Sequence, residues 1–216
     1  MFKSNKELVE YLKEIGSIRS KKLEEAFLIY DRKEFLPEEY KKYAYIDEAV
    51  PIGYGQTNSQ PSLVAYMIEE LELKPGMKVL EIGTGSGYTT AIISYIVEDG
   101  LVISIERKKE LYEFAKKNLS KYNIKNVELV LGDGSLGYPE EAPYDRIISW
   151  AAPHRIPNPW IWQLKDNGIL ISPVGPTYNQ KLVKIRKKKE KLEKKVLVDV
   201  AFVPLIGKFG YSEKDF

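Results

Sequence analysis

One segment constrains the fold of this chain more than any other. The apolar run at residues 77–83 leads directly into three glycines spaced two apart, Gly83, Gly85 and Gly87. Glycines at this spacing let the backbone turn sharply and let a ligand approach the main chain closely. The residues that follow, 88–97, have the pattern of a helix. In an open α/β sheet, ligands bind beyond the carboxyl ends of the strands, so the segment predicts a ligand site at a strand-to-helix turn.

From Lys78 onward, short apolar runs alternate with stretches of helical period. Strands are expected within residues 78–83, 101–106, 127–134, 144–152 and 168–175, and helices within 88–97, 108–123 and 159–164. This alternation predicts an α/β fold with a doubly wound, mostly parallel sheet of the Rossmann-like type. Residues 180–207 have the pattern of a β-hairpin, so antiparallel strands are expected at the end of the sheet.

The N-terminal part of the chain has a different pattern. Residues 5–15 and 20–30 are expected to form amphipathic helices, and residues 62–72 a third helix with Ser59 or Ser62 at its N-cap. Residues 32–45 are looser. We find no internal repeat and no linker, so we expect a single domain over 1–216, made of N-terminal helices and a loop at 1–60, a cofactor-binding core at 61–175 and a C-terminal hairpin and tail at 176–216.

Composition excludes several chemistries. The 216 residues include no cysteine and a single histidine, His154, so disulfides, thiolate catalysis and a Cys- or His-rich metal site are not expected. No apolar run approaches the ~20 residues that span a bilayer, and the charged N-terminal segment differs from a signal peptide, so a cytoplasmic location is expected. Heavy use of Lys, Glu and Ile is typical of thermophilic prokaryotes or archaea, although a genome low in GC would produce the same usage.

The spacing around the glycine turn distinguishes two classes of cofactor. A dinucleotide fold has the pattern G-x-G-x-x-G and holds a pyrophosphate at a helix N-terminus, whereas this chain has E-x-G-x-G-x-G. The carboxylate of Glu81 would repel a pyrophosphate and suit the positively charged amino-acid end of S-adenosylmethionine (AdoMet). Glu106 ends the next strand, where it can accept hydrogen bonds from ribose hydroxyls, and Asp133 follows the third, where it can accept one from the adenine amine. The alternative is a tight turn with solvated acids at the strand ends.

The segment from Val50 to Pro61 is the second unusual feature. Its sequence, VPIGYGQTNSQP, places glycine, proline and polar residues between apolar segments, just ahead of the glycine turn. This composition is typical of a structured loop of the Ω type. It also suits an active-site lid, and both interpretations are kept.

Several blocks together resemble the protein-L-isoaspartate (D-aspartate) O-methyltransferase family over nearly the whole chain. They are AFLIYDRKEFLPEEYKKYAYID, PIGYGQTNSQP, VLEIGTGSGY, GDGSLGYPEEAPYDRII, SWAAPHRIP and FVPLIGKFG. The resemblance implies an AdoMet-dependent enzyme that methylates the free carboxylate of L-isoaspartyl residues, with D-aspartyl residues as a further possible acceptor. The implied products are S-adenosylhomocysteine (AdoHcy) and a methyl ester, which closes to a succinimide and so begins protein repair. No metal is implied.

The resemblance also implies roles for individual residues. Ser59 is the expected catalytic residue, and its alternative role is to cap the following helix. The residues expected to bind the cofactor are Gln56, Thr57, Glu81, Gly83, Thr84, Gly85, Ser86, Gly87, Glu106, Asp133 and Gly134. The substrate peptide is expected to contact Ile52, Gly53, Ala151, Ala152 and Pro153.

Some positions depart from the family pattern. Asn58 stands where a β-branched Ile is usual, and Trp150 stands where a small residue is common. His154, Trp160 and Trp162 are also unusual, so the rim that receives the substrate is the part least defined by the resemblance.

A basic run at residues 184–195 leaves an alternative function open. It carries eight basic and two acidic side chains, which would suit contact with phosphate, or the solvated tip of a hairpin, where Lys blunts an exposed edge. The alternatives are therefore an AdoMet-dependent RNA or small-molecule methyltransferase and a non-catalytic AdoMet-binding protein. The expected partners are isoaspartyl-containing proteins and peptides, with no stable nucleic acid, no membrane and a monomer as the default state.

Overall fold

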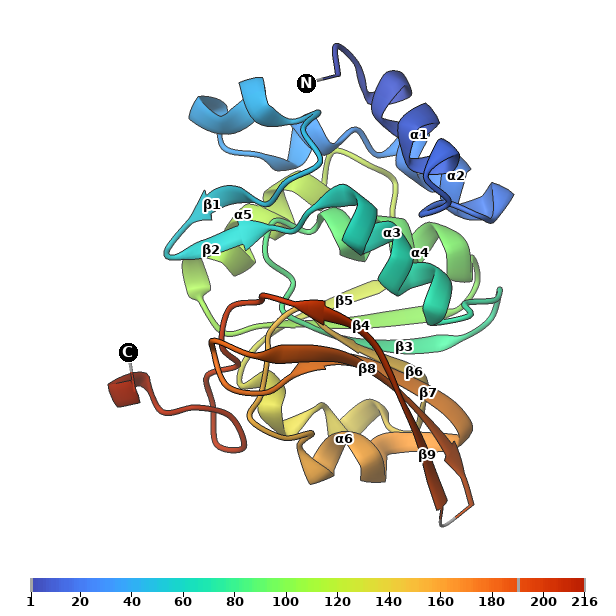
Figure 1. The fold of residues 1–216 in the computed structure, drawn as a ribbon, viewed down its shortest axis with the longest axis vertical. Coiled ribbons are helices and arrows are strands. Elements are labelled where there is room, and N and C mark those ends of the chain that lie inside the picture. The colour runs from blue at the N-terminus through green and yellow to red at the C-terminus, as the bar shows by residue number, and fades with distance from the viewer. Residues whose placement is uncertain (1, 190, 216) are drawn as a thin grey trace.

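The protein is built on one seven-stranded sheet, seen in a computed structural model that describes residues 2–189 and 191–215. The strands lie side by side in the order β5-β4-β3-β6-β7-β8-β9 (Figure 1). Their bounds are β3 Lys78–Ile82, β4 Leu101–Glu106, β5 Val127–Leu131, β6 Tyr144–Ser149, β7 Leu164–Val174, β8 Gln180–Lys188 and β9 Lys191–Val200.

The sheet is parallel from β5 to β7 and becomes antiparallel at β8 and β9. Strand order reverses direction between β3 and β6, so the carboxyl ends of these two strands flank a crevice of the kind that holds ligands in α/β folds. The predicted doubly wound, mostly parallel sheet with an antiparallel C-terminal hairpin is confirmed.

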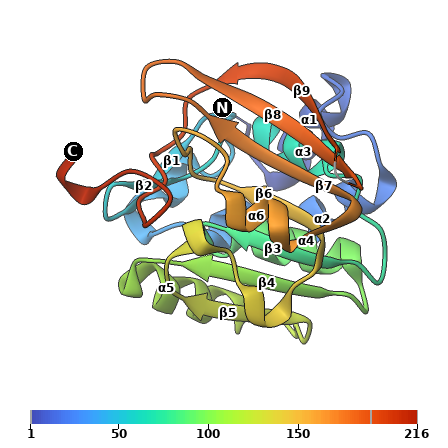
Figure 2. The same ribbon diagram turned by 90° about the horizontal axis from the view of Figure 1, so that it is seen from below.

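Helices cover both faces of the sheet. On one face lie α1 Asn5–Glu14, α2 Lys21–Ile29, α3 Pro61–Glu70, α4 Tyr88–Val97 and α5 Lys109–Leu119 (Figures 1 and 2). On the other lie α6 Asn158–Gln163 and the short 3-10 helices η3 Gly134–Leu136 and η4 Pro139–Glu141. The remaining 3-10 helices are η1 Arg32–Phe35 and η2 Glu38–Tyr43, in the segment predicted to be loose, and η5 Glu213–Asp215.

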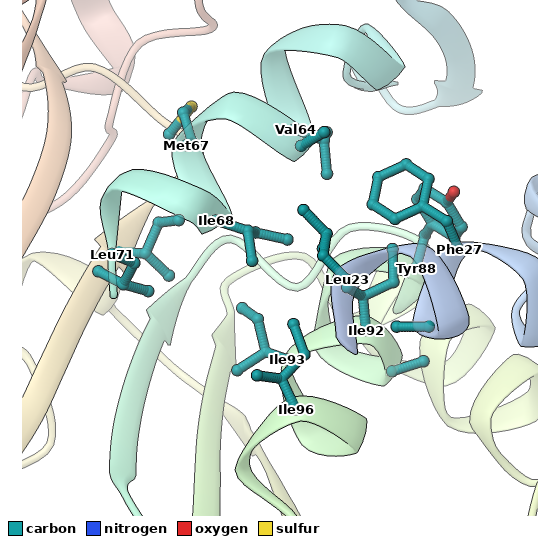
Figure 3. Close-up of a cluster of buried hydrophobic side chains, with 14 of the residues drawn as sticks. Leu23, Phe27, Val64, Met67, Ile68, Leu71, Tyr88, Ile92, Ile93 and Ile96 are labelled. Atoms are coloured by element: carbon teal, nitrogen blue, oxygen red, sulfur yellow. The ribbon is translucent and has the colours of Figure 1, made fainter. Parts of the chain in front are cut away.

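The main core lies between the helices and the first face. Figure 3 shows apolar side chains of α2, α3 and α4, among them Leu23, Ile68 and Ile92, pointing toward one another. Side chains alternate along β3, so they pack into two different clusters. Val79 belongs to the main core, while Leu80 and Ile82 belong to the cluster under α6. The strand is thus buried on both faces, which fixes the position of the glycine turn at its end.

The segment from Val50 to Pro61, expected to be a structured loop or an active-site lid, contains two short strands. It forms an antiparallel pair, β1 Val50–Gly53 and β2 Gln56–Asn58. Tyr54 and Gly55 both have positive φ, 54° and 71°, which is the geometry of a tight two-residue hairpin turn. Tyr54 gives no sequence signal for such a turn because a residue with a side chain rarely adopts it.

The start of α3 also differs from the prediction. Gln60, not Ser59 or Ser62, is the N-cap residue, and no side chain of its own caps the helix. The carboxylate of Asp47 instead accepts a hydrogen bond from the Ser62 backbone N–H at 2.8 Å. Because a distant Asp satisfies the helix end, the capping role considered for Ser59 is not used.

The basic run spans the tip of the β8–β9 hairpin, with Glu190 outside the described residues. The prediction that the run is solvated holds for Lys191, Lys194 and Lys195, which are exposed. It is wrong for Lys184, whose side chain is only 15% exposed and pairs with Glu70 and Glu72 of the α3 region. Part of this charge is therefore neutralised against the body of the protein.

Candidate active site

A cavity of about 850 Å³ opens at the carboxyl ends of β3 and β4. One wall is the glycine turn, with Gly83 and Gly85, and a second is formed by Thr57 of β2 and by Ser59 just after that strand. A third wall is the segment 198–206, which consists of the last three residues of β9 and the chain that follows them. The volume is within the range of small-molecule sites.

The glycine turn is continuous with the sheet. The backbone N–H groups of Gly83 and Thr84 both donate to the Ile105 carbonyl of β4, at 2.9 and 3.2 Å. Gly85 N donates to the Glu106 carboxylate at 2.9 Å. Gly87 has φ of 84°, and a Cβ there would lie 3.1 Å from the Leu119 side chain of α5. The turn therefore requires glycine both for its backbone angles and for its packing.

Glu106 lies where an acid at the end of the second strand was expected. It lines the cavity, and its Oε1 accepts a hydrogen bond from Lys108 N at 2.9 Å while Oε2 accepts the one from Gly85. A carboxylate oxygen accepts more than one hydrogen bond, so Glu106 keeps acceptor capacity on the cavity side.

Glu81 lies behind the turn instead of in the cavity wall. It is fully buried, and its oxygens accept hydrogen bonds from Thr89, Thr90, Ser104 and the indole N–H of Trp150. Burial raises the pKa of Glu81, and the four hydrogen bonds oppose that effect. The direct contact with the amino-acid end of AdoMet expected for Glu81 does not follow from this geometry, because both oxygens are already covered by protein groups.

One buried arginine holds the loop that carries Ser59. The guanidinium of Arg32 is fully buried and donates to Asn58 Oδ1 at 3.2 Å. It also lies within hydrogen-bond distance of five backbone carbonyls, those of Ala44, Ile46, Glu48, Asn58 and Ser59. Burial lowers the pKa of Arg32 to about 10, so the group stays charged at neutral pH. A single side chain thus fixes the backbone on both sides of the β1–β2 hairpin.

Asn58 joins this loop to the glycine turn. Its Oδ1 accepts from Arg32, and its Nδ2 donates to Ser86 Oγ at 3.1 Å. Ile52 packs against the same turn, since a Cβ on Gly85 would lie 3.3 Å from the Ile52 side chain. The unusual residue at position 58 is therefore a polar bridge between two walls of the cavity.

The third wall is fixed by main-chain hydrogen bonds to the region after β6. Ala152 N donates to the Val203 carbonyl at 2.8 Å, and Leu205 N donates to the Ala152 carbonyl at 2.9 Å. Asp133 holds the same segment further along, because its Oδ2 accepts from Lys208 N at 2.8 Å. These hydrogen bonds hold the C-terminal segment against the carboxyl edge of the sheet.

Comparisons with known proteins identify this arrangement. The family model described as protein-L-isoaspartate (D-aspartate) O-methyltransferase matches residues 3–210. The chain belongs to the protein-L-isoaspartate (D-aspartate) O-methyltransferase family. It is 50% identical to a protein-L-isoaspartate O-methyltransferase of Pyrococcus abyssi over 96% of this chain and 97% of the relative. It is 49% identical to the one of Dictyoglomus thermophilum over 96% of this chain and 93% of the relative.

A solved structure of a protein-L-isoaspartate O-methyltransferase from Plasmodium falciparum has the same fold. The TM-score is 0.85 at 30% identity, covering 95% of this chain and 99% of the other. That structure is a complex with AdoHcy. The resemblance inferred from the motifs is thus confirmed, and so is the mixed sheet of this methyltransferase fold.

Not every residue expected from the family resemblance reaches the cavity. Of those residues, the cavity is lined by Gln56, Thr57, Ser59, Gly83, Gly85, Glu106, Gly134 and Ala151. Thr84 and Ser86 line a smaller adjoining cavity of about 30 Å³. Seven expected residues line neither, namely Ile52, Gly53, Glu81, Gly87, Asp133, Ala152 and Pro153.

Two of these seven, Asp133 and Ala152, hold the C-terminal segment in place without lining the cavity. The Oδ1 of Asp133 accepts from Ser135 N at 2.9 Å, so together with the bond to Lys208 both oxygens are engaged by backbone. The adenine contact predicted for Asp133 gains no support from this arrangement. Ala152 pairs with segment 198–206 through its backbone, so it supports the wall without lining the cavity.

The unusual residues near the rim have separate positions. Trp160 is fully buried under the sheet, where its indole N–H donates to the Gly134 carbonyl at 2.9 Å. Trp162 is 71% exposed. His154 packs against Tyr211, with ring centroids 4.4 Å apart. Trp150, unlike these three residues, lines the cavity, as far as the described residues show.

Sequence reasoning missed most of the third wall. Residues 198–206 line the cavity, and so do Leu63 and Tyr66 of α3. The family block FVPLIGKFG gave a signal for part of this segment, but nothing in it indicated which residues face a ligand.

Within residues 2–189 and 191–215, no group of three or more His, Cys, Asp or Glu side chains is placed to hold a metal ion. In the same part of the chain, no helix has the length and apolar character needed to cross a bilayer.

Proposed function

We propose that this chain transfers the methyl group of AdoMet to the free carboxylate of an L-isoaspartyl residue in damaged proteins and peptides. The products are AdoHcy and a methyl ester, which closes without the enzyme to a succinimide whose hydrolysis returns some normal aspartate. The observation that carries the proposal is the family match over residues 3–210, on a chain whose loop and glycine turn face one cavity.

The cavity fits AdoMet in size and in chemistry. The Glu106 carboxylate suits ribose hydroxyls, and the glycine backbone leaves room for close approach of a ligand. Ile82, Ile105 and Ile206 supply apolar surface suited to an adenine ring. When bound, AdoMet supplies an electrophilic methyl group on a positively charged sulfur.

The acceptor needs no catalytic base. An aspartyl-type carboxyl has a pKa of about 4, so it is ionised and nucleophilic at pH 7. The protein then has to hold the carboxylate oxygen in line with the methyl carbon and sulfur, and such positioning can contribute roughly 7–11 kcal/mol. This accounts for activity without a Cys or His nucleophile in a chain that has no cysteine.

We propose that Ser59 orients the acceptor carboxylate through its hydroxyl. Its backbone carbonyl is held by Arg32 at 3.1 Å, and it lines the cavity with Thr57 and Gly85. Gln56 and Thr57 border the same space, and the backbone of Ala151 is accessible to a substrate peptide because its side chain is small. The loop excludes water, which strengthens the attraction between carboxylate and sulfonium.

The chain is proposed to work as one methyltransferase domain. The three parts 1–60, 61–175 and 176–216 each contribute a wall, through Ser59, Gly83 and Leu205 respectively. We further propose that it acts as a cytoplasmic monomer without nucleic acid or membrane. Light scattering of the purified protein checks the monomer, and binding to RNA at two salt concentrations checks the nucleic acid.

The decisive experiment supplies labelled AdoMet with three matched peptides that contain Asp, L-isoAsp or D-Asp at one position. Base-labile methyl groups are expected on the L-isoAsp peptide and not on the Asp peptide, and the D-Asp peptide tests the breadth of the acceptor. Labelling of none of the three, or labelling of nucleic acid alone, would overturn the proposal.

A further inference from the structure

Trp150 occupies a position that connects the buried acid to the cavity. It follows β6 directly, and its backbone N–H donates to the Ile82 carbonyl at 2.9 Å, next to the glycine turn. Its indole N–H donates to Glu81 Oε1 at 2.8 Å. The residue is only 7% exposed, and a Cβ on Gly83 would lie 3.5 Å from the Trp150 Cβ.

Trp150 also lies where the loop and the glycine turn meet. It lines both the large cavity and the small one beside it. The residues that share this property are Thr57, Ser59, Gly83, Gly85 and Trp150. If Ser59 orients the acceptor and the glycine turn borders the cofactor, the reacting methyl group lies between them, and Trp150 is the aromatic side chain at that boundary.

Glu81 gives this tryptophan an unusual electrostatic setting. Its hydrogen-bond partners are three hydroxyls and one indole N–H, and no ion pair to it is found within residues 2–189 and 191–215. An indole whose N–H is bonded to a carboxylate has a more electron-rich ring, and the face of Trp already attracts cations more strongly than those of Tyr and Phe. Trp150 therefore forms a largely buried part of the cavity wall beside the turn, with the Glu81 carboxyl bonded behind its ring.

We propose that Trp150 is a positioning residue that presents its indole face to the positively charged sulfur of AdoMet, with Glu81 holding the ring in place. The inference rests on the proposed function, because it takes AdoMet as the methyl donor. Since AdoHcy lacks the methyl group and the positive charge, the same surface binds the product less tightly than the cofactor. Trp150 thus favours cofactor binding and product release.

Binding measured by calorimetry without an acceptor peptide tests this. Trp150→Leu is expected to weaken AdoMet binding by about 3-fold or more, since cation–π contacts have that magnitude. AdoHcy affinity is expected to change by less than about 2-fold, so the preference for AdoMet over AdoHcy falls. Trp150→Phe keeps an aromatic ring without the N–H. Its AdoMet affinity is expected to lie between those of the parent protein and Trp150→Leu. Trp162→Leu, at an exposed position, is the control and should leave both affinities unchanged.

A second measurement avoids the risk that a substitution unfolds the site. The chain has three tryptophans, and Trp160 and Trp162 line neither cavity within the described residues. Replacing tryptophan with mono- and difluorotryptophan lowers the electron density of the ring face without removing the side chain. AdoMet affinity should fall in step with fluorination while AdoHcy affinity stays level.

Equal weakening of both ligands, or no weakening of AdoMet, would overturn the proposal. Because these are binding measurements, they are independent of the identity of the acceptor. A protein that loses AdoMet selectivity as expected but does not methylate the L-isoAsp peptide would refute the proposed acceptor and leave the role of Trp150 standing.

Discussion

The glycine turn and the loop that carries Ser59 face each other across one cavity, yet they are held in different ways. The turn continues a buried strand, and its support is shared among backbone bonds to Ile105, the Glu106 carboxylate and packing against α5. The loop is joined to the short β1–β2 pair, and one guanidinium, that of Arg32, binds five backbone carbonyls, three before the pair and two at or just after its end. The glycine turn is therefore supported mainly by its continuity with the sheet, whereas the loop is held mainly by side-chain hydrogen bonds, most of them from Arg32.

The largest expected effect comes from removing that residue. Arg32→Met removes the donor to the backbone carbonyls on both sides of the hairpin, so kcat/KM should fall by about 100-fold or more, and the free energy of unfolding by roughly 3–5 kcal/mol. AdoHcy binding, measured by calorimetry, should weaken far less, because the glycine turn keeps its own support. A folded Arg32→Met protein with normal turnover would show that the loop does not depend on Arg32.

The next effect concerns the Ser59 hydroxyl, which is proposed to orient the acceptor carboxylate. Ser59→Ala is expected to lower kcat by about 10-fold or more, equivalent to ~1.4 kcal/mol, with little change in melting temperature, since Ser59 does not cap α3. Turnover of the L-isoAsp peptide is the measurement, and Ser120→Ala, at the exposed end of α5, is the control. Unchanged kcat would assign Ser59 a structural role only.

A smaller effect is expected for the bridge between the two walls. Asn58→Ala and Ser86→Ala each break the hydrogen bond between these side chains. A double-mutant cycle on unfolding free energies should give a coupling of about 0.5–1.5 kcal/mol, the usual net value of one hydrogen bond. If the two effects simply add, the walls are held independently and the bridge contributes nothing.

The smallest effect lies away from both walls and concerns pH. Partial burial opposes the ionisation of Glu70 and Glu72, but hydrogen bonds and charges from Lys184, with Arg19 for Glu70 and Arg186 for Glu72, outweigh it and lower both pKa values. A carboxyl with a lowered pKa in the folded state stabilises the protein above its unfolded pKa of about 4.5, and that stabilisation is lost as the pH falls through the folded values.

Melting temperature measured between about pH 6 and 3 should therefore decline less steeply in Lys184→Met than in the parent protein. Activity at pH 7 should stay the same, because Lys184 lies outside the cavity lining. Identical pH profiles would show that the pairing seen at the base of the hairpin is not stabilising in solution.

The sequence predicted the parts of the molecule that repeat a physical pattern. The parallel sheet followed from strands and helices in alternation, and the glycine turn followed from its spacing, because both are local. Arg32 lies within one of the family blocks, but the sequence indicates no role for it. Its partners are backbone carbonyls of residues 44–59, and a backbone carbonyl has no sequence signature.

The surroundings of Glu81 could not be predicted for a related reason. The motif placed an acid before the glycines, but it did not show that Thr89, Thr90 and Ser104 lie close enough to bind both oxygens. Trp150 was noted as a departure, and its partner became visible only when β6 was placed beside β3. Contacts between distant strands are set by the topology, which the sequence indicated in outline but not side chain by side chain.

The wall formed by residues 198–206 has a consequence for synthesis of the protein in the cell. A chain still emerging from the ribosome can bury the strands β3, β4 and β6 before this segment is free, because domains begin to fold as they are made. The cavity is closed only when Phe202, Val203 and Leu205 have reached the edge of the sheet. This wall of the cavity is therefore completed only after residues 202–205 have been synthesised and have left the ribosome.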